Sequence, residues 1–232
     1  MKILGISTSG STCGAALMRD GAILGCDSFP GARKCSEELI PRMERLLSSN
    51  GLDLRSPDMF AVDIGPGGMT GLKIGIVTIR TLSQVLSIPI SPVSSLEALA
   101  RSAPEDAALV MPALPCTKST FYAALFRRAP GGAPERLSPD ALLDPGSLPS
   151  LLSAAPSVQP LHIVGAAPDA LRAALSSLIG PRAFFRDPAD SRPTAVAVCE
   201  IAASGPAPSR FSDILPNYLC VTAAENNFGI KV

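Results

Sequence analysis

The sequence predicts an α/β fold built around a mixed, five-stranded sheet flanked by helices. Two observations carry this prediction. Short apolar runs of strand length alternate with longer segments in which apolar residues recur at the spacing of one helix face. Three of the strand-like runs follow one another at the N-terminus with only turn residues between them, and the later runs are separated by helical segments. The expected order in the first half is therefore three strands, then helix, strand, helix, strand and helix.

The strands of the first half are short apolar runs bounded by turn residues. Arg19-Asp20-Gly21 has the composition of a tight hairpin turn and joins the second run to the third. The expected strands are 2–7, 13–18, 22–27, 59–64 and 89–93.

The helices expected in the same half are 36–49, 71–87 and a third that ends near residue 103. Ser36 is the expected N-cap of the first helix, because acidic residues follow it in the turn that the helix dipole favours for them. Pro41 lies inside this helix and is expected to kink it or to delay its regular start. Thr70 can cap the second helix, and Ser94 with Glu97 forms a capping box that begins the third.

The composition changes after Ala103, which predicts two domains, 1–103 and 104–232. The segment 129–160 is rich in Pro, Gly, Ser and Ala and is expected to form surface loops around one weak helix. Pro193 is expected in the first turn of the last helix. The expected strands of the second half are 108–114, 121–126 and 162–164, and the expected helices are 148–154, 168–179 and 193–204.

The charge and cysteine content exclude several classes of protein. Lys and Arg number 20 and Asp and Glu number 20, so the chain has no net field that would attract nucleic acid or an anionic membrane. No apolar run approaches the roughly 20 residues needed to cross a bilayer. The six cysteines include no Cys-x-x-Cys pair, so we expect unpaired thiols and neither a zinc cluster nor a disulfide framework. These features predict a cytoplasmic protein.

The glycine-rich segment GPGGMTGLKIG, residues 65–75, has the composition of a phosphate-binding loop but not its spacing. It matches neither the Walker A motif nor the dinucleotide fingerprint. Its position between a strand and a helix still leaves an anion site open. Alternatively, Gly71 and Gly75 lie four apart on one helix face and admit a close neighbour, either within the chain or from a partner. The candidate anion or nucleotide residues are Gly67, Gly68, Thr70, Gly71 and Lys73.

The candidate catalytic groups lack the neighbours that a catalyst needs. His162 is the only histidine and lies in an apolar run, which favours a strand position and excludes a two-histidine metal site. Cys116 ends an apolar run and is interpreted as a small strand-end residue. Glu37 and Glu38 are interpreted as first-turn acids, and Asp63 as an acceptor of amide hydrogen bonds from the glycine turn. We therefore expect no catalytic residue and no metal site.

Three segments of the first 103 residues together resemble the TsaB family, also called YeaZ. They are ILGISTSGSTCGAAL, SEELIPRMERLL and FAVDIGPGGMTGLKIGIVTIRTLSQVLSIPISPVSSLEALA. The glycine block and the Ser-Ser-Leu-Glu motif after it are the most specific parts, and the resemblance extends weakly to 121–124 and 215–219. It implies an actin-like (ASKHA, ribonuclease H-like) fold of two related domains.

The resemblance also implies a function. Proteins of this family are required for N6-threonylcarbamoyladenosine at position 37 of tRNAs that read codons beginning with A. They act as non-catalytic subunits beside the transferase TsaD and the ATPase TsaE, or form a homodimer when alone. Contact with tRNA is then indirect, and any ATP or ADP lies at the heteromeric interface. The partner surface implied by the first two helices is Ser36, Leu39, Ile40, Met43, Leu46, Leu47, Gly71, Leu72, Gly75, Ile76, Ile79 and Leu82.

The chain departs from the family pattern at several positions. Ser7 stands where relatives carry Asp, Cys35 where they carry His, and Cys116 where they carry Asp. A hydroxyl cannot replace a carboxylate in holding hydrated Mg²⁺, so Ser7 argues against ATP hydrolysis on this chain alone. Two alternatives remain open: a nucleotide-dependent kinase or ATPase of the ASKHA superfamily, and a divergent glycoprotease-like (M22) protein.

Overall fold

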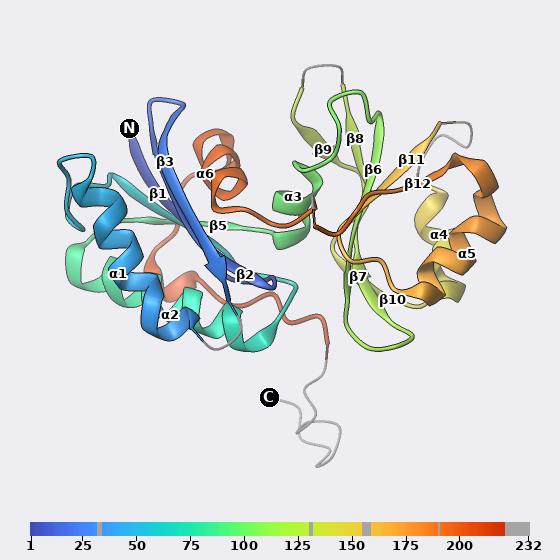
Figure 1. Cartoon of the computed structure of the whole chain (residues 1–232), viewed down its shortest axis with the longest axis horizontal. Helices are drawn as coiled ribbons and strands as arrows, with labels where there is room; N and C mark the ends of the chain where they lie inside the picture. Colours follow the sequence, from blue (N-terminus) through green and yellow to red (C-terminus); the bar gives the residue numbers. More distant parts are fainter. Residues whose placement is uncertain (32–33, 130–131, 155–158, 190, 221–232) are drawn as a thin grey trace, which may run out of the picture.

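The computed structural model describes residues 1–31, 34–129, 132–154, 159–189 and 191–220. Two β-sheets lie side by side, with helices on both faces of each (Figure 1). This arrangement confirms the predicted α/β class.

The first sheet has five strands in the order β3-β2-β1-β4-β5. β1 pairs antiparallel with β2 and parallel with β4, so the sheet is mixed, as predicted. Asp20 and Gly21 have φ of 50° and 85°, the left-handed conformation that a two-residue hairpin turn requires. The strands are β1 (Lys2–Ser7), β2 (Thr12–Arg19), β3 (Ala22–Pro30), β4 (Met59–Asp63) and β5 (Ile90–Val93).

The second sheet repeats the plan of the first. Its path β10-β7-β6-β11-β12 has two antiparallel pairings followed by two parallel ones, as in the first sheet. β8 extends this sheet by pairing with β6, and β9 pairs with β8. The strands are β6 (Leu109–Pro115), β7 (Phe121–Ala123), β8 (Phe126–Arg128), β9 (Pro134–Arg136), β10 (Ala141–Leu143), β11 (Leu161–Val164) and β12 (Ala183–Phe185).

The outer faces of the two sheets are covered by helices from the same half of the chain. α1 and α2 bury their apolar stripes against the first sheet, in one core with Leu4, Ile6 and Phe60. α4 and α5 cover the second sheet in the same way, around Met111 and Ile163. The helices are α1 (Cys35–Ser48), α2 (Met69–Leu86), α4 (Leu148–Leu152) and α5 (Asp169–Ile179), with short 3₁₀ turns at Pro145–Ser147, Gly180–Arg182 and Phe211–Asp213.

The inner faces are covered by an exchange of helices between the halves. α3 (Ser95–Ala100) follows the first sheet in the chain but packs against the second, where Leu96 and Leu99 contact Val110 and Phe126. α6 (Ala195–Ser204) follows the second sheet but packs against β1, β2 and β4 of the first. The division into 1–103 and 104–232 stays a prediction, and each half would supply the inner helix of the other.

Two predicted helix caps are wrong. α1 begins at Cys35, and its N-cap is Lys34, whose carbonyl accepts from the amides of Glu37 and Glu38. Ser36 therefore lies inside the first turn. α2 begins at Met69, because the extended Gly68 is its N-cap and the Gly68 carbonyl accepts from Leu72. The Ser94 cap is confirmed, since its hydroxyl accepts from the amide of Glu97 at 3.3 Å.

The second half contains more strand than the sequence predicts. The expected strand 121–126 is two strands, β7 and β8, that pair with different partners. β9 and β10 lie in the segment expected to form only loops and one helix; each has three residues, too short to show periodicity. Pro193 precedes α6, which Thr194 caps by accepting from the amide of Ala197. Among the described residues, no helix is both long enough and apolar enough to cross a membrane.

Candidate functional site

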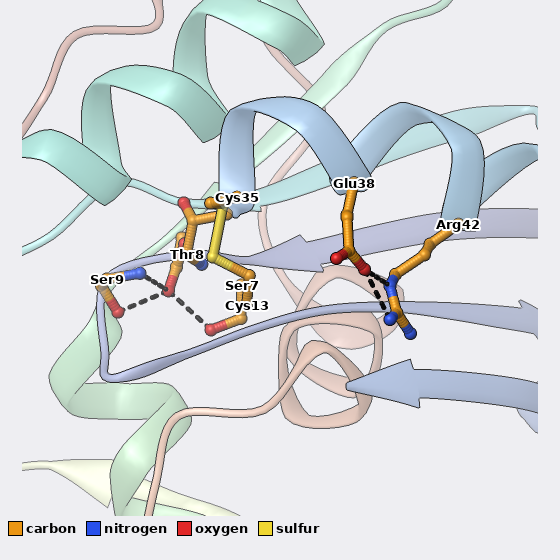
Figure 2. Close-up of a disulfide and its surroundings, with 8 residues drawn as sticks. Ser7, Thr8, Ser9, Cys13, Cys35, Glu38 and Arg42 are labelled. Carbon is orange, nitrogen blue, oxygen red and sulfur yellow. Dashed lines mark hydrogen bonds and ion pairs between the residues drawn. A yellow bond between two sulfur atoms is a disulfide. The ribbon is translucent and has the colours of Figure 1, made fainter. Parts of the chain in front are cut away.

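The turn between β1 and β2 is held by a carboxylate from the neighbouring strand. β1 and β4 run parallel with Ile6 opposite Val62, so Ser7 and Asp63 come next to each other at the ends of the two strands. Asp63 accepts hydrogen bonds from the Ser7 hydroxyl at 2.8 Å, the Thr8 amide at 2.9 Å, and the Ser9 amide and hydroxyl at 3.2 and 2.5 Å. Figure 2 shows the three turn residues beside the start of α1.

Asp63 is completely buried, and the chain itself fills its acceptor positions. Burial raises the pKa of this carboxyl, and the hydrogen bonds from Ser9, Thr8 and Ser7 oppose that rise. Two carboxylate oxygens offer about four lone-pair positions, and four donors already occupy them. The group is therefore suited to fixing the turn. The prediction that Asp63 receives amide bonds is correct in kind, but the donors come from the β1–β2 turn and not from the glycine segment.

The glycines of α2 receive the same turn. A Cβ on Gly71 would collide with the carbonyl oxygen of Thr8, and one on Gly75 would collide with the Thr8 hydroxyl. A Cβ on Gly67 would lie 2.7 Å from the carbonyl oxygen of Ser9. The close neighbour that the sequence left unassigned therefore lies within the chain: the glycine face of α2 packs on the β1–β2 turn.

The residues predicted to bind an anion fall into two groups in the structure: some contact the β1–β2 turn, and others are exposed to solvent. The amide of Gly68 donates to the Ser9 carbonyl at 2.8 Å, and Gly71 contacts Thr8. Thr70 and Lys73 are exposed on α2. Anion binding by these residues stays a prediction, although carbonyl oxygens of the turn occupy the glycine face.

Two cavities lie near the turn. One, of about 520 Å³, is bounded by Ser7, Cys26 and Thr194. The other, of about 400 Å³, lies between Ser9 and Ser191. Arg192 lines both cavities, but its Nε and Nη2 atoms donate to the carbonyl of Ala189 at 3.0 and 2.7 Å. The Arg192 guanidinium is thus hydrogen-bonded to the backbone three residues earlier in its own loop.

Cys13 and Cys35 form a disulfide, which corrects the expectation of unpaired thiols (Figure 2). Cys13 lies in β2 and Cys35 is the first residue of α1, with their Cα atoms 6.2 Å apart. The bond therefore attaches the start of α1 to the sheet. The sequence carries no spacing signal for it, because two cysteines 22 residues apart meet only when the helix folds over β2.

Arg42 attaches the middle of α1 to the sheet edge. Its guanidinium bonds Glu38 at 2.6 Å and both oxygens of Asp27 at 2.9 and 3.0 Å, and it lies 4.4 Å from the centre of the Phe29 ring. The hydrogen bonds that the guanidinium donates to Glu38 and Asp27 raise the pKa of Arg42. The Arg42–Glu38 contact is drawn in Figure 2. Glu38 therefore acts as an ion-pair partner on the helix.

Eight of the twelve predicted partner-surface residues are buried in the chain's own core. Ser36 and Ile40 are exposed, and Gly71 and Leu82 are half-buried. Three exposed apolar residues lie on the same two helices: Ile40, Val77 and Val85, which are 41%, 60% and 73% exposed. A groove of about 490 Å³ lies between Glu44 and Ser48 of α1 and Thr81 and Val85 of α2. The partner surface stays a prediction.

The other candidate groups lie apart from the turn. His162 is half-buried in β11, stacks on Phe184 with ring centres 5.3 Å apart, and has its pKa lowered by burial. Cys116 donates to the Tyr122 hydroxyl at 3.3 Å. Within the described ranges, no three His, Cys, Asp or Glu side chains form a group that could hold a metal ion.

The chain is similar in sequence to proteins of one tRNA-modification pathway. Residues 31–129 match the model of the TsaD family, described as tRNA N6-adenosine threonylcarbamoyltransferase. The tRNA threonylcarbamoyladenosine biosynthesis protein TsaB of Bacillus subtilis is 33% identical over 142 residues, which cover 60% of this chain and 61% of that protein. The Escherichia coli protein of the same name is 28% identical over 148 residues, covering 62% and 63%.

The chain is thus similar to TsaB (YeaZ) proteins over about three fifths of its length and to the TsaD family over residues 31–129. The alignments span about three fifths of the length of these curated TsaB relatives. The structure of YeaZ from Pseudomonas aeruginosa has a TM-score of 0.75 at 23% identity and covers 94% of this chain and 99% of that chain. This likeness agrees with the two-sheet α/β fold of the chain.

Proposed function

We propose that this chain is a member of the TsaB (YeaZ) family and a non-catalytic subunit in the synthesis of N6-threonylcarbamoyladenosine at position 37 of tRNAs reading codons that begin with A. The names of the similar B. subtilis and E. coli proteins, which place them in threonylcarbamoyladenosine biosynthesis, support this pathway. Its partner in the proposal is a TsaD-like transferase, with a TsaE-like ATPase in the same assembly.

The observation that carries the non-catalytic role is the enclosed carboxylate of Asp63. The Ser7 hydroxyl, at the position where relatives carry Asp, donates to Asp63. Asp63 is fully buried and already accepts four hydrogen bonds. Binding hydrated Mg²⁺ with a nucleotide needs carboxylate oxygens that water and metal can reach. In this chain Ser7 and Asp63 instead fix the β1–β2 turn on which α2 packs.

The partner surface in this proposal is the exposed side of α1 and α2. Ile40, Val77 and Val85 supply apolar contacts there, and their neighbours Glu44 and Lys73 are exposed and oppositely charged. An apolar stripe with a charged rim is the composition of a helix-packing interface. The chain's zero net charge agrees with binding of tRNA mainly by the partner. A homodimer through the same face is expected when the partner is absent.

Co-purification with the TsaD-like subunit of the same cell tests the proposal. We expect a stable complex with the native chain and loss of the complex with Val77→Asp or Val85→Asp. Leu178→Asp is the matched control, because Leu178 is also an exposed apolar helix residue but lies on α5. Failure to co-purify, together with unchanged levels of the modified adenosine after depletion of the chain, would overturn the proposal.

The kinase or ATPase alternative is tested separately by calorimetry of the chain with Mg²⁺ and ATP. The proposal expects no heat of binding for the chain alone. Saturable binding that survives Val77→Asp but is lost in Asp63→Asn would favour the enzyme.

A further inference from the structure

The last described segment of the chain links the two sheets. Ile214 is buried in the outer core of the first sheet. The Asn217 amide donates to the carbonyl of Ile64 at 2.7 Å, and the Asn217 side chain donates to Asp140 at 3.2 Å. Leu219 and Cys220 then pack against the inner core of the second sheet. We call residues 214–220 the strap (Figure 1).

The strap ends at a second cysteine. Cys116 lies directly after β6, in the turn that leads to β7, and its thiol donates to the hydroxyl of Tyr122 at 3.3 Å. Cys220 packs on the same core cluster as Tyr122 and contributes to the raised pKa of that phenol. Both cysteines pack on the same core and both are partly exposed. One core cluster therefore brings Tyr122 together with two cysteines that are 104 positions apart in the sequence.

The surroundings favour thiol chemistry. Burial, followed by the hydrogen bonds and charge interactions with Cys116 and Cys220, raises the pKa of Tyr122. The phenol thus stays protonated and can donate to a thiolate. Partial exposure gives a small oxidant access to both sulfurs. In contrast, the Cys199 thiol is buried under β1, and burial raises its pKa to about 12.

We propose that Cys116 and Cys220 are a redox pair, which a low-molecular-weight disulfide such as glutathione disulfide converts to an intramolecular disulfide. One cysteine thiolate attacks a sulfur of glutathione disulfide, forms a mixed disulfide and releases one glutathione thiolate. The second cysteine thiolate attacks the protein sulfur of the mixed disulfide and releases the second glutathione. Two electrons pass to the oxidant, and the two cysteine protons go to the released glutathione thiolates.

The Cys116–Cys220 disulfide would attach the C-terminal end of the strap to the second sheet. Asn217 already binds Ile64 beside the first sheet and Asp140 beside the second. A covalent bond from Cys220 to the β6–β7 turn would add a permanent anchor on the second sheet. Oxidation would thereby limit the separation of the sheets at this edge, and reduction would release it.

The experiment uses the full chain, incubated at neutral pH with glutathione disulfide. Remaining thiols are alkylated, the protein is digested without reduction, and the peptides are identified by mass spectrometry. We expect a linked peptide pair containing Cys116 and Cys220, two hydrogens lighter than the sum of the separate peptides. In Cys220→Ser we expect Cys116 to retain glutathione as a mixed disulfide. Cys26, an exposed thiol on β3, is the internal control and should carry glutathione in both proteins.

Two results would overturn the proposal. One is a native chain in which Cys116 or Cys220 keeps glutathione and no linked pair forms. The other is a chain in which both thiols stay unmodified while Cys26 reacts. Repeating the reaction in urea shows whether pairing depends on the fold: selective pairing should be replaced by mixed products that include Cys26 and Cys199. Hydrogen exchange provides a second measurement, with slower exchange of the Asn217 amide expected after oxidation.

Discussion

The hydroxyl of Ser7 donates to the carboxylate of Asp63 across 2.8 Å, which joins the end of β1 to the end of β4. Three more donors from Thr8 and Ser9 complete the enclosure of that carboxylate. The turn fixed in this way is the surface on which Gly71 and Gly75 of α2 rest. The arrangement makes Asp63 the structural centre of the candidate site.

Asp63→Ala is expected to destabilise the chain by about 2–4 kcal/mol. The change leaves buried amides and hydroxyls without an acceptor, and each unpaired buried group costs about 1–3 kcal/mol. Urea unfolding followed by circular dichroism measures the loss. The control is Asp58→Ala, since Asp58 accepts from the Lys2 amide at the surface and should matter much less. Equal losses in the two variants would contradict the assigned role of Asp63.

The same carboxyl predicts a pH dependence of stability. The pKa of Asp63 is raised above 3.8 in the folded chain, so the folded state binds the proton more tightly than the unfolded state does. Between 3.8 and the folded pKa, stability should therefore fall as pH rises, and this contribution should be constant above the folded pKa. Asp63→Asn replaces the ionisable carboxyl with an amide, so the variant lacks this contribution to the pH dependence of stability. The difference in unfolding free energy between native and Asp63→Asn proteins, measured from pH 4 to pH 8, should show this slope; a flat difference would refute it.

Gly71→Ala and Gly75→Ala are both expected to destabilise the chain by about 1–3 kcal/mol, the usual cost of overpacking. Without a collision, alanine in a helix would stabilise it by about 1 kcal/mol relative to glycine, so the sign of the effect is diagnostic. Thr8→Ala should largely rescue Gly75→Ala, because the clashing atoms belong to the Thr8 side chain. It should not rescue Gly71→Ala, which meets the Thr8 backbone. Thermal unfolding of the double variants checks this; equal rescue of both would show that the packing is described wrongly.

Loss of the Cys13–Cys35 disulfide is expected to lower stability by about 3 kcal/mol, the contribution typical of a loop of this length. Cys13→Ala combined with Cys35→Ala tests this without adding a buried hydroxyl. Cys26→Ala is the control, because Cys26 is an exposed free thiol. Unfolding of the native chain should also become easier on addition of dithiothreitol. An unfolding midpoint that is the same with and without reductant would argue against the bond.

Arg42→Lys is expected to weaken the attachment of α1, although it keeps the positive charge. Lysine cannot bond Glu38 and both oxygens of Asp27 together, and it loses the flat contact with Phe29. Arg42→Met tests the charge itself. The difference between the Lys and Met variants should shrink in 1 M salt, where exposed charges are screened. A difference that does not change with salt would mean that side-chain packing dominates.

The first half of the fold follows from its sequence because its strands are apolar runs bounded by turn residues and its helices have clear apolar stripes. The predictions that failed there were the N-caps of α1 and α2. Cys35 is bonded to Cys13 and becomes the first residue of α1, and the Gly68 carbonyl begins α2 in place of Thr70. These positions depend on contacts between distant elements, which local cap propensity does not include.

The candidate site was predicted in part. The glycines indicated a close neighbour, and that neighbour is Thr8. Its identity required the parallel pairing of β1 with β4, which no local pattern encodes. A signal for Asp63 was present, since a carboxylate at the end of an apolar strand needs buried donors. The donors themselves, from Ser7 to Ser9, lie 54 to 56 positions earlier and become visible only in the fold.

The exchange of α3 and α6 has a consequence for synthesis on the ribosome. The inner face of the first sheet is covered mainly by Ala195–Ser204, near the end of the chain. All strands of that sheet have emerged about one hundred residues earlier. The nascent sheet must therefore expose Ile3, Ala16 and Ala61 while the second half is translated, or delay its assembly until α6 arrives. Translation stalled before residue 195 should leave a product prone to aggregation and to capture by chaperones.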